Sequence, residues 1–244
     1  MLLTQLWQLE CYDALPSTSD YCINYIRQGG TAELAVLARK QTCGRGSRGR
    51  HWVDSGQALA LSVVLKTDQH CFLEGWPFVT SLAFYEGLVR VVPQVSSRLL
   101  IKWPNDILLD GRKLGGILIE KEASFVVIGL GANLLHAPNE YDIGYKAAYL
   151  GMCGEVPDVV DVAKTILDCL AFYRDIWLVK GFEEIRTSWL TRAHPLGTFL
   201  VVESENTHEE GYFSGITSQG YLLLDTIMGM KTIVTGSVLL PDRR

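Results

Sequence analysis

The chain has 244 residues, of which 48% are hydrophobic and 20% are charged, and its formal net charge at pH 7 is −5. This length and apolar content suffice for a core that needs no metal or disulfide, and the negative charge argues against a protein whose main task is to grip DNA. The six cysteines form no Cys-x-x-Cys pair and have no histidine at metal-ligand spacing, which favours reduced thiols in a cytoplasmic protein. The N-terminal residues 1–5 lack the features of a secretion signal, and no apolar run reaches membrane-spanning length.

The N-terminal part predicts a helix and two strands around a basic loop. A helix is expected over residues 19–27, and strands over 33–38 and 58–65. The nearly continuous apolar run 58–65 is typical of a strand covered on both faces. Between the strands, residues 44–50 contain three arginines and three glycines, which expose backbone N–H groups. This loop is suited to hold a phosphate or a carboxylate; the alternative is a solvated surface loop.

The middle of the chain predicts one helix and a group of strands. Apolar residues recur at helical spacing over 77–92. Residues 99–103 and 107–109 predict a hairpin, Asp110-Gly111 a tight turn, and residues 114–120 and 125–130 two further strands. Residues 136–154 show no clear periodicity and are expected to form a long loop.

In the C-terminal part the predicted elements change from helices to short strands. Asp158 is expected to cap a helix that reaches about residue 177, and a further helical stretch ends near residue 190. Short strands are then predicted over 198–202, 211–216, 221–225 and 232–240, with a turn at 218–220. This pattern predicts a catalytic domain over residues 1–193 and a small barrel or sandwich over 194–244.

Three charged residues near the predicted hairpin are candidates for chemistry. Lys102 lies inside an apolar strand, where an ammonium is costly to bury unless it meets an anion. Asp106 is a candidate magnesium-associated carboxylate, and its structural alternative is a cap or turn residue. Lys113 stands beside a Gly-Gly pair, which lets the backbone come close to a ligand.

Together these segments resemble the biotin protein ligases. Residues 41–52, 102–106 (KWPND), 113–118 (KLGGIL) and 129–133 occur in that family's order and spacing, and Ser17-Thr18 matches its early Ser-Thr signature. The resemblance covers nearly the whole chain. It implies an α+β fold, with a mixed β-sheet catalytic domain of the class II synthetase-like type, packed helices and a C-terminal SH3-like β-barrel.

The resemblance also implies an activity. Biotin protein ligases use ATP and Mg²⁺ to convert biotin into biotinyl-5′-adenylate and pyrophosphate, then transfer the biotinyl group to a lysine of a biotin carboxyl carrier protein, such as that of acetyl-CoA carboxylase. The first step brings a carboxylate against a phosphate. Two unit charges about 4 Å apart repel by roughly 4 kcal/mol at an effective dielectric constant near 20, so cationic groups are needed.

Residue roles carry over by matching positions. The catalytic group is Arg45, Lys102 and Lys113. The biotin-binding group is Ser17, Thr18, Ser19, Gln41, Gly44, Arg45, Gly46, Ser47, Trp52, Lys113, Gly115 and Gly116. The nucleotide-binding group is Arg48, Arg50, Trp52, Lys102, Asn105, Asp106 and Asn133, with Asp106 also the candidate magnesium ligand.

Three features depart from the family pattern, one of which is that the segment after Trp52 is one residue shorter than usual. Ser47 stands where another arginine is usual, and Ala58 stands where an asparagine is usual. We therefore expect the adenylate to be retained less tightly than in ligases with the full arginine set. A lipoate or octanoate ligase remains an alternative, as does a degenerate homologue that binds biotin without transferring it.

The family's partners give further expectations. Only about sixteen residues precede the Ser-Thr signature, which predicts a ligase without a DNA-binding helix-turn-helix arm. A homodimer is compatible with the family.

Overall fold

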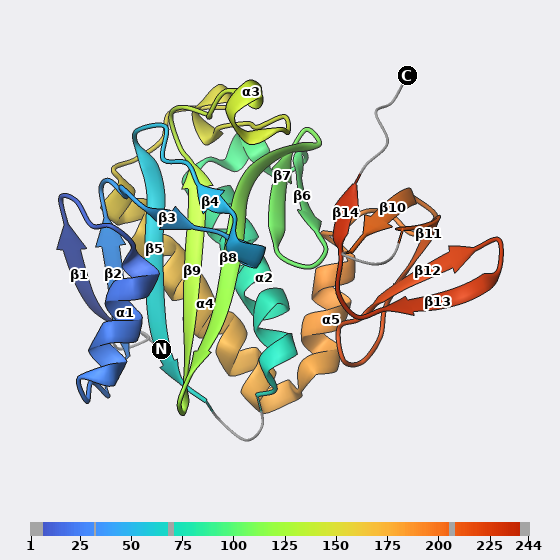
Figure 1. The fold of residues 1–244 in the computed structure, drawn as a ribbon, viewed down its shortest axis with the longest axis horizontal. Coiled ribbons are helices and arrows are strands. Elements are labelled where there is room, and N and C mark those ends of the chain that lie inside the picture. Colours follow the sequence, from blue (N-terminus) through green and yellow to red (C-terminus); the bar gives the residue numbers. More distant parts are fainter. Residues whose placement is uncertain (1–6, 32, 68–70, 205–207, 240–244) are drawn as a thin grey trace.

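The computed structural model describes residues 7–31, 33–67, 71–204 and 208–239. Its main body is built on a seven-stranded mixed sheet (Figure 1). In spatial order the strands are β1 (Gln8–Tyr12), β2 (Leu34–Ala38), β5 (Ala58–Lys66), β9 (Phe125–Asn133), β8 (Arg112–Glu122), β7 (Asp106–Leu109) and β6 (Leu99–Lys102). β1 runs parallel to β2, and every other neighbouring pair is antiparallel.

Helices cover both faces of this sheet (Figure 1). The helices of the structure are α1 (Thr18–Arg27), α2 (Trp76–Val91), α3 (Glu140–Ile143), α4 (Val159–Lys180) and α5 (Phe182–Leu190), of which the short α3 lies beyond one end of the sheet. α2 and α4 pack against each other and against one face, whereas α1 lies on the opposite face against β5 and β9. The sheet is therefore the middle layer of a three-layer body.

β5 shows how the sequence serves both layers. Side chains of successive strand residues point to opposite faces. Leu59, Leu61 and Val63 join the large core under α2 and α4, whereas Val64 joins a smaller cluster under α1. All three layers are thus held by apolar burial, and only Ser62 interrupts the run with a buried polar side chain.

α1 begins where a side chain caps its first turn. The Ser17 hydroxyl accepts a hydrogen bond from the Asp20 N–H and satisfies one of the free donors at the helix start. Cys22 and Ile26 are the apolar anchors of the buried side of α1. This arrangement fixes the N-terminus of α1 on the outer face of the sheet, beside Ser62.

The C-terminal part is a five-stranded antiparallel sheet that packs beside the main body (Figure 1). In spatial order its strands are β13 (Gly229–Ile233), β12 (Leu222–Thr226), β11 (His208–Ile216), β10 (Phe199–Glu203) and β14 (Ser237–Leu239). The Trp103 indole N–H donates to the Gly220 carbonyl across the junction at 2.9 Å, and one apolar cluster includes residues of both parts. The two parts therefore share a continuous core.

Most predicted elements are confirmed to within a few residues. Asp110 and Gly111 both adopt positive φ, as expected for a tight hairpin turn. Four predictions were incomplete or wrong. β1 was not predicted, and neither were the two short strands β3 (Gly44–Arg45) and β4 (His51–Trp52) at the ends of the basic loop. The segment 136–154 contains α3 and a short 3₁₀ turn (Leu150–Met152), and the single strand predicted over 232–240 is two strands, β13 and β14. Residues 1–5 and 240 lie outside the described residues. Among the described residues, no helix is long and apolar enough to cross a membrane.

Candidate functional site

A cavity of about 310 Å³ lies on the α1 face of the sheet. It is bounded by the N-terminus of α1, by β8 and β9, and by a small hairpin of β3 (Gly44–Arg45) and β4 (His51–Trp52). Thirteen of the predicted site residues line it: Ser17, Thr18, Ser19, Gln41, Arg45, Gly46, Ser47, Arg50, Trp52, Asn105, Asp106, Lys113 and Gly116. The volume falls at the lower end of the range for small-molecule sites, roughly 300–1,000 Å³.

The floor of the cavity depends on two glycines of β9. A Cβ atom at Gly129 would lie 2.7 Å from the Ser19 hydroxyl, and one at Gly131 would lie 2.8 Å from the Trp52 indole. Both distances are too short for a real Cβ, so only glycine lets α1 and Trp52 come this close to the sheet. Trp52 thereby forms an aromatic wall of the cavity.

One end of the cavity is lined by hydroxyl and amide groups. The Thr18 N–H and hydroxyl both donate to the Gln41 amide oxygen, at 2.8 and 3.1 Å. The Ser62 hydroxyl lies 2.8 Å from the Thr18 hydroxyl and 3.0 Å from the Ser19 hydroxyl. These groups can exchange partners with a polar ligand, because hydroxyls rotate and both donate and accept.

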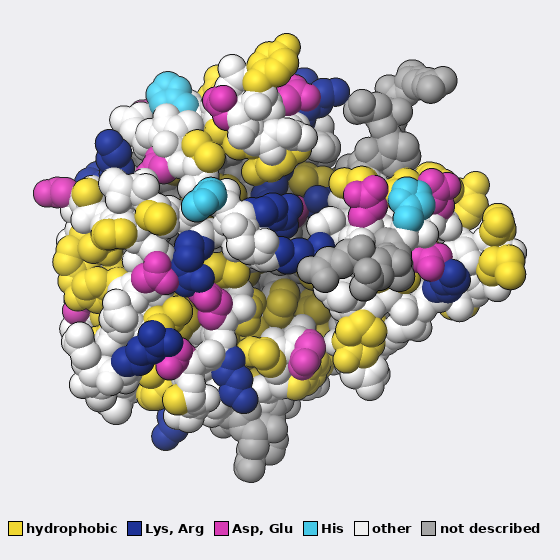
Figure 2. Space-filling view, in the orientation of Figure 1, with side chains coloured by type: hydrophobic (Ala, Val, Ile, Leu, Met, Phe, Trp, Pro, Cys, Tyr) yellow, Lys and Arg dark blue, Asp and Glu magenta, His cyan; other side chains and the backbone are white. Residues whose placement is uncertain are grey.

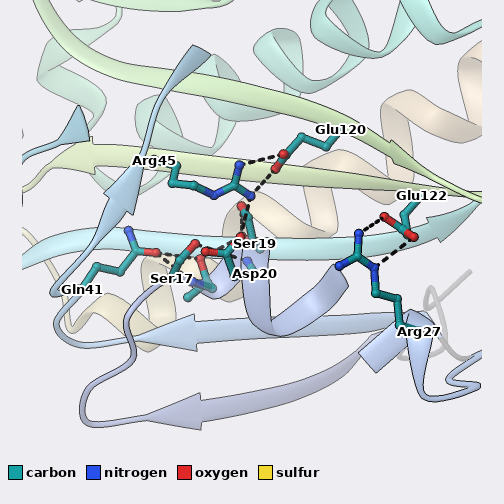
Figure 3. A network of polar contacts seen from close by, with 10 residues as sticks. Ser17, Ser19, Asp20, Arg27, Gln41, Arg45, Glu120 and Glu122 are labelled. Carbon is teal, nitrogen blue, oxygen red and sulfur yellow. Dashed lines mark hydrogen bonds and ion pairs between the residues drawn. The ribbon is translucent and has the colours of Figure 1, made fainter. Parts of the chain in front are cut away.

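The β3–β4 hairpin carries the basic loop. Both Nη atoms of Arg45 donate to the Glu120 carboxylate, each at 2.7 Å, and Nη2 also lies 2.9 Å from Asp20 Oδ1 (Figure 3). These bonds raise the pKa of the Arg45 guanidinium, although burial lowers it. Arg50 donates to the Ser47 carbonyl and hydroxyl oxygens at 3.2 and 3.0 Å. The loop is thus ordered by its own side chains.

Asp106 lies between two lysines at the other end of the cavity. Its Oδ1 is 2.7 Å from Lys113 Nζ, and its Oδ2 is 2.9 Å from Lys102 Nζ. Burial alone would raise the pKa of this carboxyl, but the two ammonium groups outweigh it and hold the pKa below its usual range. Lys113 Nζ also lies 5.5 Å from the centre of the Tyr145 ring. Basic side chains gather at the centre of the face shown in Figure 2, where the main body meets the C-terminal sheet.

Residues 12–133, half of the chain, match the Biotin/lipoate A/B protein ligase family. The chain belongs to this family. It is 36% identical to the biotin–[acetyl-CoA-carboxylase] ligase of Paracoccus denitrificans over 214 residues, which cover 83% of the chain and 88% of that protein. It is 32% identical to the bifunctional ligase/repressor BirA of Bacillus subtilis (strain 168), over 93% of the chain and 72% of that protein.

Solved structures show the same fold. The biotin protein ligase from Aquifex aeolicus in complex with biotin and ATP superposes with a TM-score of 0.85 at 24% identity, covering 96% of the chain and 99% of that protein. The superposition confirms the predicted α+β fold of a ligase of this family, with its mixed sheet, its helices and its C-terminal β domain.

Five residues that the ligase resemblance assigns do not line the cavity: Gly44, Arg48, Lys102, Gly115 and Asn133. Arg48 instead donates to the Ser237 and Thr235 hydroxyls of the C-terminal part. A Cβ at Gly115 would contact Phe84 of α2, in the core. Asn133 is buried and donates to the Ala148 carbonyl at 2.9 Å, while its Oδ1 has no hydrogen-bond partner.

Lys102 faces the junction between the two parts of the ligase. Its Nζ donates to the Val238 carbonyl of β14 at 3.1 Å, besides its ion pair with Asp106. His194 is buried close by, and burial, together with the charge of Lys102, lowers the pKa of its imidazole to about 4. Lys102 is therefore placed to join the C-terminal sheet to the site rather than to contact a ligand in the cavity.

Sequence reasoning missed several residues of the site, including the floor glycines Gly129 and Gly131, and four of the missed residues have polar or aromatic side chains that contact the predicted ones. Ser62 lines the cavity and Tyr145 covers the ammonium of Lys113, while Asp20 and Glu120 hold Arg45. Ser62 could have been found, because it is the one polar residue in the apolar run of β5. The other three carry no comparable signal, since charged and aromatic residues are common at solvent-facing positions.

The surroundings of Asp106 do not fit a protein-held magnesium ion. Each of its oxygens already meets a lysine ammonium, which would repel a further cation. Within the described ranges, no group of three or more His, Cys, Asp or Glu side chains is arranged to hold a metal. The sequence-based assignment of Asp106 as a magnesium ligand therefore has no support in this arrangement.

Proposed function

We propose that this chain is an ATP-dependent biotin protein ligase, which forms biotinyl-5′-AMP and transfers the biotinyl group to a lysine of a biotin carboxyl carrier protein. The observation that carries the proposal is the cavity itself, with hydrogen-bonding groups at one end, an aromatic wall and a lysine at the other. Family membership and the names of its relatives support the same reaction.

The polar end of the cavity suits the ureido ring of biotin. A ureido group presents one carbonyl acceptor and two N–H donors. Both donors and acceptors surround this end of the cavity, and they come from Ser17, Thr18, Ser19, Gln41 and the Ser62 hydroxyl. The tetrahydrothiophene ring and apolar tail of biotin would then pass along Trp52, Leu118 and Gly116, with the carboxylate directed toward Lys113.

Lys113 is the cation best placed to serve the adenylation step. Attack of the biotin carboxylate on the α-phosphate forms an O–P bond and breaks the bond between the α- and β-phosphates, which releases pyrophosphate, so negative charge accumulates around the α-phosphate. A preorganised ammonium at that point stabilises the transition state more than the separated ground state. Asp106 keeps the ammonium of Lys113 in position at 2.7 Å, and Arg50 lines the same cavity from the basic loop.

ATP would bring its magnesium with it. Mg²⁺ commonly keeps most of its ligands from phosphates and water and needs few protein carboxylates. This mode fits a site whose carboxylate is already paired with lysines. We assign residues 1–193 to the catalytic domain and 194–244 to the C-terminal β domain. A cytoplasmic location, the absence of a DNA-binding arm and a homodimer stay predictions.

The experiment that tests the proposed function is ATP–pyrophosphate exchange. Purified protein is given labelled pyrophosphate, ATP and Mg²⁺ with biotin, lipoate or octanoate. Exchange that depends on biotin supports the proposal. Exchange that depends on lipoate or octanoate instead would assign the chain to the other branch of its family, and biotin binding without exchange would make it a degenerate homologue.

A further inference from the structure

The guanidinium of Arg45 is shared by two carboxylates that neither the motifs nor the family match single out. Glu120 accepts from both Nη atoms in a bidentate pair, and Asp20 meets Nη2 from the other side (Figure 3). One positive charge thus faces two negative charges. The two carboxylates outweigh the charge of the guanidinium and engage both of its Nη atoms, so the group is poorly placed to neutralise a further anion, although Nε is buried without a partner among the described residues and stays open as a single donor.

The three side chains come from three separate elements. Arg45 belongs to β3, Glu120 to β8 and Asp20 to the first turn of α1. In sequence, Arg45 and Glu120 are 75 residues apart. The contact therefore ties the small hairpin to the sheet on one side and to the helix that carries Ser17, Thr18 and Ser19 on the other.

Apart from the hydrogen bonds of Arg48 to the C-terminal hydroxyls, the β3–β4 hairpin has few contacts that position it. It consists of two residue pairs, Gly44 with Trp52 and Arg45 with His51, and an isolated hairpin of this size is not stable on its own. Backbone bonds secure the segment just before it, through Thr42 and Cys43. The side-chain tie through Arg45 is the ion-paired connection of the hairpin to β8 and α1.

We propose that Asp20 and Glu120 are positioning residues, which hold Arg45 as a brace so that the β3–β4 hairpin and Trp52 are fixed over the cavity before biotin binds. The proposal rests on the proposed function, since biotin is taken as the ligand. The task of Arg45 is then mechanical, and the neutralisation of the reacting anions falls to Lys113 and Arg50. Preorganisation of this kind raises affinity by removing an ordering cost from binding.

The competing arrangement is an exchange of partners, in which Arg45 leaves Glu120 when an anionic ligand arrives. The two arrangements predict opposite changes in biotin affinity when Glu120 is removed. A brace that loses Glu120 loosens the hairpin and weakens biotin binding. An exchangeable pair that loses Glu120 frees Arg45 and strengthens binding.

The test uses Glu120→Gln in the full chain, with Glu122→Gln as the matched control. Glu122 lies two residues along the same strand and also makes an Arg pair, but its partner is Arg27 of α1, at 3.0 Å, and not Arg45 of the hairpin (Figure 3). Dissociation of labelled biotin is followed after a chase with unlabelled biotin. For Glu120→Gln we expect about tenfold faster dissociation, since the pair is roughly one quarter to one third exposed and is worth more than a surface pair.

The same variants separate a positioning role from a general loss of structure. Glu120→Gln should raise the KM for biotin by a similar factor while kcat stays within about twofold, and Glu122→Gln should change neither. Asp20→Asn should have a smaller effect in the same direction, because the Asp20 side chain is half exposed. Unchanged or slower dissociation from Glu120→Gln would overturn the proposal.

A comparison of the double variant with the single variants tests whether Glu120 acts through Arg45. If Glu120 acts through Arg45, then Arg45→Gln with Glu120→Gln should release biotin no faster than Arg45→Gln alone. Independent, multiplying effects would contradict the brace. If the wild-type protein does not bind biotin at all, the proposed function fails and not the brace, so the two failures are distinguishable.

Discussion

Replacement of Lys113 by alanine should lower the rate of adenylate formation far more than replacement of Lys102. Both lysines pair with the same carboxylate of Asp106, at 2.7 and 2.9 Å, and both side chains are about equally buried. Only Lys113 lines the cavity, whereas Lys102 is directed to the Val238 carbonyl. The two variants are therefore matched in what they do to Asp106 and differ in what they do to a ligand.

The size of the effect follows from the charge that Lys113 supplies. An ammonium about 4 Å from a developing negative charge contributes roughly 4 kcal/mol at an effective dielectric constant near 20. Solvent and the remaining cations compensate in part, so a loss of about 10²-fold to 10³-fold in kcat is expected, as for other single preorganised donors. Lys102→Ala should lower kcat by less than about tenfold. It should instead lower the free energy of unfolding, because it removes the hydrogen bond to Val238 across the junction.

The assay is single-turnover formation of biotinyl-5′-AMP at saturating biotin and ATP, with nucleotide binding measured separately by calorimetry. Lys113→Ala should bind ATP within a few-fold of wild type. Equal losses of kcat in the two variants would refute the division of labour between the two lysines. An unchanged rate in Lys113→Ala would refute the role of Lys113 altogether.

Three further predictions concern the loop, the junction and the floor of the cavity. Ser47→Arg should slow the release of biotinyl-5′-AMP, because Ser47 lines the cavity and an added guanidinium there attracts the phosphate; a chase assay in which wild type releases the adenylate no faster than the variant would contradict this. The pKa of His194 is lowered to about 4, so its stabilising contribution is complete above about pH 6.5 and falls as the pH drops toward 4. Between pH 7 and pH 5 the wild type should lose about 2 kcal/mol of unfolding free energy that His194→Phe does not lose, as checked by urea denaturation; equal losses would contradict the assignment. Gly131→Ala should weaken biotin binding about tenfold, because its Cβ would lie 2.8 Å from the Trp52 indole and displace that wall; unchanged affinity by calorimetry would show that Trp52 does not wall the biotin site.

Elements with a strong apolar pattern could be predicted from the sequence. α2, β5 and β9 each bury a continuous or periodic set of apolar residues, and their bounds were predicted to within a few residues. β1 escaped prediction because it is a short edge strand without a fully buried residue. The break between β13 and β14 was missed because the residues on both sides of Gly236 have the composition of a strand.

For the functional site, what could be predicted from the sequence depended on the type of residue. Residues that belong to the recognisable motifs, such as Ser17, Gln41 and Lys113, were predicted and do line the cavity. The direction of long charged side chains could not be predicted. Arg48 turns to the C-terminal hydroxyls and Arg45 to Glu120, because partners many residues away along the chain become neighbours only when separate sheets pack together.

The most direct test of the account is transfer to an acceptor. The protein is incubated with an apo biotin carboxyl carrier domain, ATP, Mg²⁺ and an equimolar mixture of biotin and lipoate, and the carrier is followed by intact mass spectrometry. The account predicts an ATP-dependent mass increase of one biotinyl group on a single lysine, and its loss in Lys113→Ala. A lipoyl group on the carrier, or no modification by the wild-type protein, would contradict it.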